Sequence, residues 1–155
     1  MQAKDFKYKG HRNSYTELNE VYFWTITINK WQHLFKQDEN KMIIINSLQW
    51  LVQKELIKIY GYVIMPNHIH LMWEQLAMNG KEFPKNSLEK FTTKTLVSNM
   101  KAGHDINLKN YSVTATDRQY NIWLPDPLAI KVLSRDMASQ KLDYMPARLV
   151  IQAGI

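Results

Sequence analysis

The chain has 155 residues, the usual length of one compact domain, and 45% of them are hydrophobic, which is enough to bury a core. It has no cysteine, so disulfides and thiolate metal sites are excluded and a cytoplasmic setting is expected. The formal charge of +6 favours a polyanionic partner such as nucleic acid.

The composition also predicts one domain over residues 1–155 without a membrane segment. No run approaches the roughly 20 consecutive apolar residues that span a bilayer. Residues 1–19 are polar and basic, unlike a secretory signal peptide, and we expect them to form an N-terminal arm.

The first half of the chain predicts a strand, a helix and a hairpin. Residues 21–29 (VYFWTITIN) are rich in β-branched and aromatic residues, which are typical of strands. Residues 39–55 carry apolar side chains at helical spacing, with Asp38 as the expected N-cap. Residues 56–65 and 68–76 have strand composition, and the short Pro-Asn turn between them predicts an antiparallel hairpin.

The second half predicts two helices. Ser87 is the expected cap of a helix over residues 88–101, and residues 111–124 leave open a short strand at 120–124. The strongest helical pattern runs from Pro127 to residue 145, with Asp126 as the expected N-cap. This order of elements predicts an α+β fold, a ferredoxin-like antiparallel sheet with helices packed on one face.

His68 and His70 stand at the start of the second hairpin strand. Side chains two residues apart on a strand point to the same side, so the two imidazoles can converge on one divalent ion. Ile69 between them should point into the core. An isolated pair of this kind is more often structural, and the spacing alone leaves both interpretations open.

The segment YGYVIMPNHIHLMW, residues 60–73, resembles the signature of HUH single-tyrosine transposases. The resemblance points to the REP-associated tyrosine transposases of the insertion-sequence-200-like superfamily. The segments VYFWTITINKWQHLF and IWLPDPLAIKVLSRDMASQKLDYM are similar to the family's first strand region and its C-terminal helix. The resemblance extends over residues 20–145, approximately.

This resemblance implies an enzyme that cleaves and rejoins hairpin-flanked single-stranded DNA through a 5′-phosphotyrosine intermediate, as in DNA transposition and recombination. It implies Mg²⁺ or Mn²⁺ held by His68 and His70, and a homodimer. The KLDYM segment matches the family's tyrosine motif and selects Tyr144 as the nucleophile. Tyr111 and Tyr120 are weaker alternatives, because neither lies on a convincing helix.

The chain departs from the family after Tyr144. An amide residue four places on completes the family's metal site, whereas this sequence has Arg148, which cannot bind a cation. From the family we would also expect roughly another turn of helix and a tail at the point where the sequence reaches Ile155. Gln140, one turn before Tyr144, is a possible replacement ligand, although a solvated amide is the more common role for such a residue.

Several basic and aromatic residues could bind DNA. Phosphates could be neutralised by lysines of the 88–101 region and by the N-terminal arm: Lys85, Lys90, Lys94, Lys101, Lys4, Lys7, Lys9 and Arg12. Unpaired bases could stack on Trp31, Trp73 and Trp123. For each lysine taken alone, a solvated surface charge is the more common role, and for each tryptophan a place in the core is the more common role.

Two other functions remain open from the sequence. One is a DNA-binding descendant of the same fold with weakened catalysis. The other is an unrelated metal-dependent hydrolase or ferredoxin-like binding module in which the histidine pair is incidental.

Overall fold

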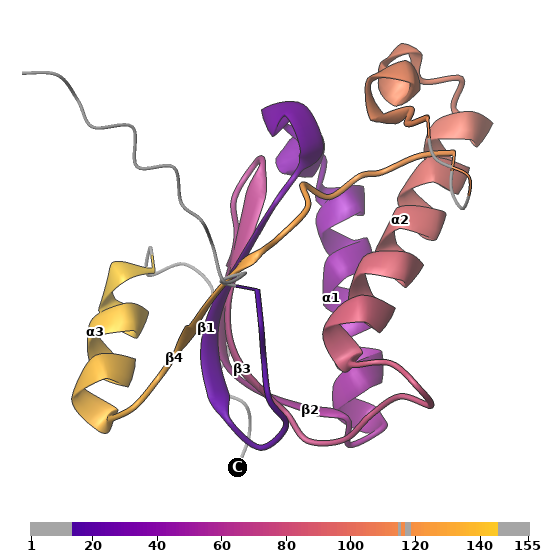
Figure 1. Ribbon diagram of the computed structural model, residues 1–155. Helices are drawn as coiled ribbons and strands as arrows, with labels where there is room; N and C mark the ends of the chain where they lie inside the picture. The colour runs from indigo at the N-terminus through magenta and orange to yellow at the C-terminus, as the bar shows by residue number, and fades with distance from the viewer. Residues whose placement is uncertain (1–13, 115, 117–118, 146–155) are drawn as a thin grey trace, which may run out of the picture.

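The computed structural model describes residues 14–114, 116 and 119–145. This part of the chain contains both strands and helices (Figure 1). In chain order the elements are β1 (Val21–Thr27), η1 (Asn29–Trp31), η2 (Leu34–Lys36), α1 (Asp38–Gln53), β2 (Ile57–Ile64), β3 (His68–Gln75), α2 (Pro84–Ala102), η3 (Ile106–Tyr111), β4 (Leu128–Lys131) and α3 (Arg135–Tyr144), where η marks a 3-10 helix.

The four strands form one antiparallel sheet in the order β2-β3-β1-β4. The α1 helix connects β1 to β2 across β3, and α2 leads from β3 to β4 across β1. This is the split βαβ arrangement of ferredoxin-like folds. The predicted α+β class and ferredoxin-like antiparallel sheet are therefore confirmed.

The two faces of the sheet have different partners. Alternate residues of a strand point to opposite faces, and Trp24 and Leu71 join α1 and α2 in the main hydrophobic core. Phe23 and Met72 point the other way and join a smaller cluster with residues of α3. Figure 1 shows α1 and α2 on one side of the sheet and α3 on the other. The prediction that helices share one face holds for α1 and α2, whereas α3 covers the opposite face.

The segment predicted as one helix over residues 127–145 forms a strand followed by a shorter helix. Leu128–Lys131 pairs with β1, so that Ala129 lies opposite Trp24. Asp126 has a positive φ of 58° and does not cap a helix. The open edge of β1 offers backbone hydrogen bonds that the local helical pattern cannot reveal, and these bonds take residues 128–131 into the sheet.

Two smaller predictions also change. The α2 helix begins at Pro84, so Ser87 lies within its first turn and Phe83 is the N-cap. The Ser87 hydroxyl donates to Glu82 Oε1 instead. Residues 120–124 form no strand, and contribute only isolated bridges at Tyr120 and Trp123.

Part of the expected N-terminal arm is attached to the domain. The buried Thr16 hydroxyl accepts a hydrogen bond from Gln75 Nε2, and Asn19 N–H donates to the Gln75 carbonyl oxygen. Residues 1–13 lie outside the described residues. Of the helices in the described part of the chain, none is both long and apolar enough to cross a membrane.

Candidate functional site

The β2-β3 turn places two histidines on the face of the sheet that α3 covers. His68 and His70 occupy the first and third positions of β3, and Ile69 between them is buried in the main core, as predicted. The Nε2 atoms of the two rings lie 3.2 Å apart. Two nitrogens that each bind one ion at about 2.1 Å would be roughly 3.0–3.4 Å apart at 90–109°. The spacing therefore fits a shared divalent ion.

The other nitrogen of each ring is held by a polar neighbour. His68 Nδ1 lies 2.7 Å from Asn67 Oδ1, which only accepts, so Nδ1 carries the proton and Nε2 is free to accept. His70 Nδ1 lies 2.8 Å from Thr25 Oγ1, a hydroxyl that can donate or accept. Without an ion, His70 Nε2–H can donate to His68 Nε2. An ion would replace that proton, and His70 would then donate through Nδ1 to Thr25.

Both imidazoles are uncharged at neutral pH. Burial lowers the pKa of His68. Burial, and then the neighbouring His68, lowers the pKa of His70 to about 4. Uncharged imidazoles with oriented ring protons are the form that binds metals, and such outer partners hold the ligand in place.

Tyr144, the last residue of α3, lies beside this pair. Its ring centroid is 6.2 Å from that of His70, and the two rings meet edge to face. The next residue, Met145, is buried in the cluster with Phe23 and Met72, which fixes the end of α3 against the sheet. Tyr144 itself is 73% exposed, so its hydroxyl remains open to a large substrate.

Two further residues complete the surroundings of His70. Phe23 stacks on the His70 ring with centroids 5.3 Å apart, and Lys141 Nζ lies 5.5 Å from the Phe23 centroid. Neither was predicted as a site residue. The sequence did contain a signal for Lys141, because it is three residues before Tyr144 and therefore on the same side of the helix. Phe23 and Thr25 required knowledge of which strand pairs with β3.

The described residues offer no evident third ligand for the predicted metal site. No group of three His, Cys, Asp or Glu side chains in that part of the chain is arranged to hold an ion. Gln140 is exposed on α3 and makes no hydrogen bond to either histidine within the described structure. Its role as a ligand stays a prediction. Arg148 lies outside the described residues.

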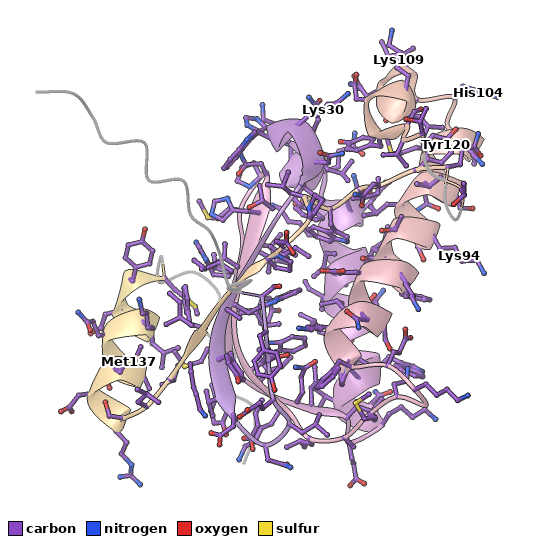
Figure 2. The ribbon with its side chains drawn as sticks, in the orientation of Figure 1. Lys30, Lys94, His104, Lys109, Tyr120 and Met137 are labelled. Atoms are coloured by element: carbon purple, nitrogen blue, oxygen red, sulfur yellow. The ribbon has the colours of Figure 1, made fainter. Side chains whose placement is uncertain are left out.

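The lysines predicted to bind DNA lie on α2, across the sheet from the histidines: Lys85, Lys90, Lys94 and Lys101. Lys85 Nζ donates to the Ser14 carbonyl oxygen at 2.7 Å, and burial lowers its pKa. Lys90 pairs with Glu82 at 2.6 Å. Lys94 is exposed and projects from α2 (Figure 2). DNA binding by these lysines stays a prediction, but Lys85 and Lys90 already have polar partners, and Lys101 contacts the ring of Tyr120. Arg12 and the lysines of the arm lie outside the described residues.

The alternative tyrosines are poorly placed for attack beside the histidines. Tyr111 is 1% exposed, and burial, with Asp105 nearby, raises its pKa to about 12. Tyr120 lies near α2, its ring 5.2 Å from Lys101 Nζ (Figure 2).

The three tryptophans proposed to stack on bases differ in exposure. Trp73 and Trp123 are buried in the main core, so their interpretation as stacking residues is wrong. Trp31 is exposed.

Comparison with known proteins finds relatives of the fold. No protein-family profile and no curated protein matches the sequence. A solved REP-associated tyrosine transposase bound to a REP hairpin superposes with a TM-score of 0.54 and 17% identity, covering 84% of this chain and 67% of that chain. A candidate transposase from Deinococcus radiodurans R1 superposes with a TM-score of 0.50 and 15% identity, covering 84% and 91%. The chain therefore has the fold of these transposase structures.

Proposed function

We propose that the chain is a metal-dependent transposase that nicks and rejoins hairpin-flanked single-stranded DNA through a 5′-phosphotyrosine intermediate on Tyr144. The observation that carries the proposal is the meeting of His68, His70 and Tyr144 in one place, with the two Nε2 atoms 3.2 Å apart. A relative of the fold was solved with a REP hairpin, which supports hairpin DNA as the substrate.

His68 and His70 would hold Mg²⁺ or Mn²⁺ through Nε2, with Gln140 as the proposed third ligand. Imidazole is softer than Mg²⁺ prefers, so Mn²⁺ suits these ligands at least as well. When bound, the ion would polarise a backbone phosphate and offset its negative charge.

The chain's own residues supply the covalent step. Tyr144 Oη would form a bond to phosphorus as the bond from phosphorus to the 3′ oxygen breaks. The tyrosine loses its proton and the released 3′ oxygen gains one, leaving a 3′-OH. Attack by a 3′-OH on the phosphotyrosine reverses the step, so rejoining needs no external energy source. Lys141, on the same side of α3, would offset phosphate charge.

A denaturing gel tests the proposal. Labelled hairpin oligonucleotides from the flanks of the gene are incubated with Mn²⁺ and the wild-type protein. A DNA-protein band that resists denaturation is expected, and it should disappear with Tyr144→Phe and with His70→Ala. Tyr120→Phe is the matched control and should keep the band. A band that persists in Tyr144→Phe would assign the nucleophile elsewhere.

A non-catalytic DNA-binding protein of the same fold is the second candidate. The observation that favours it is the missing third ligand among the described residues. Hairpin binding without any covalent band, with either metal, would support this candidate over the enzyme. Sedimentation of the free and DNA-bound protein would test the homodimer that we also propose.

A further inference from the structure

The exposed indole of Trp31 is attached to the turn that precedes His68. Ile28 N–H donates to the Asn67 carbonyl oxygen at 2.8 Å, and Phe35 N–H donates to that of Pro66 at 3.0 Å. Trp31 N–H in turn donates to the Ile28 carbonyl oxygen. The chain from Ile28 to Phe35, which includes η1, is therefore held at both ends against the turn that orients His68.

Trp31 contributes little to the stability of the fold. Its side chain is 63% exposed, and η1 has no buried residue. Its φ is 54°, and that of Lys30 is 55°. This left-handed region is unfavourable for a bulky side chain, and such conformations cluster at functional sites. A large aromatic residue kept on the surface in a strained backbone is better explained by a ligand than by packing.

The surroundings of Trp31 include two cations. Lys30 and Lys36 are exposed within five residues of it. Figure 2 shows Lys30 at the same end of the molecule as Lys109. An aromatic ring beside lysines suits single-stranded DNA, because its bases stack on aromatic rings and its phosphates attract lysines.

We propose that Trp31 is a stacking platform for one unpaired base of the strand that enters the His68–His70 site, with Lys30 and Lys36 beside the flanking phosphates. This inference rests on the proposed function, and names a subsite of it. Stacking on one aromatic side chain changes affinity by about 5- to 150-fold.

The test measures affinity for a labelled hairpin oligonucleotide with a single-stranded flank, by fluorescence anisotropy at fixed salt. Trp31→Ala should weaken binding within that range, and Trp31→Phe should keep most of it. Trp50→Ala is the matched control, because Trp50 is also exposed but lies on α1, and it should bind like wild type. Single abasic positions along the flank should weaken wild type at one position and leave Trp31→Ala unaffected there.

Trp31→Gly separates a binding role from a structural one. Glycine tolerates a positive φ, so the melting temperature should stay equal or rise while affinity falls as in Trp31→Ala. Equal affinity of Trp31→Ala and wild type would overturn the stacking site and leave the proposed function intact. A lower melting temperature in both variants, with affinity reduced in proportion, would assign Trp31 to the fold. Failure of the wild type to bind any single strand would overturn both proposals.

Discussion

The two ring nitrogens of His70 have different partners, so the partner of Nδ1 can be removed without changing the group that Nε2 faces. Nε2 faces His68, whereas Nδ1 is held by Thr25 Oγ1 at 2.8 Å. Removal of such an outer partner typically weakens metal affinity by about 10- to 100-fold. Thr25→Val should therefore weaken Mn²⁺ binding by that amount, as measured by calorimetry. Thr27→Val, two residues along on the same face, is the control, and an equal decrease in both variants would contradict a specific role for the Thr25 hydroxyl.

Two lysines that both lie on helices should behave differently toward DNA. Lys141 lies over Phe23 beside His70, whereas Lys90 pairs with Glu82 on the far side of the sheet. Removing one lysine that binds a DNA phosphate reduces the slope of log affinity against log salt by about one. Lys141→Gln should reduce that slope and slow adduct formation, and Lys141→Arg should restore the slope. Lys90→Gln should change neither. A changed slope in Lys90→Gln alone would place the DNA along α2.

At the level of elements, the start of α3 is held by a side-chain cap. Ser134 Oγ accepts from Met137 N–H at 3.1 Å, and no residue within α3 is buried. Removing a cap costs about 1 kcal/mol, which is large for a short helix held by a small cluster. Ser134→Ala should speed amide hydrogen exchange throughout α3 and reduce adduct formation, with little change in global melting. Ser139→Ala on the same helix should leave exchange unchanged, and the same increase there would rule out capping.

How far the elements could be predicted depended on how local their determinants are. The β2-β3 hairpin follows from Pro66 and Asn67 and from flanking strand composition, and the shared face of His68 and His70 follows from strand periodicity. The hydrogen bond of Thr25 to His70 joins residues 45 positions apart, and the register between β1 and β3 that creates it is not visible in either segment. Residues 128–131 likewise joined the sheet because the edge of β1 was free.

For the whole molecule, the main hydrophobic core and the residues of the candidate site lie on opposite faces of the sheet. The main core lies between the sheet and α1 and α2. The histidines lie on the other face, which is covered by α3, the helix that carries Tyr144 and is attached by a small cluster. Substitutions in the site should therefore cost little stability. This separation also determines where a complete site can be assembled, because α3 can bring Tyr144 to the histidines of its own chain or to those of a second copy.

The contact between Tyr144 and His70 lies within a single chain, with centroids 6.2 Å apart. We therefore predict that each active site is built from one chain even if the protein dimerises. Tyr144→Phe and His70→Ala, each inactive alone, should stay inactive when mixed, as measured by the covalent DNA adduct. A site shared between chains would recover up to about a quarter to a half of wild-type adduct, because mixed dimers would contain one intact pairing. Refolding the two variants together ensures that subunits exchange, so recovered adduct would show that α3 serves the partner's histidines.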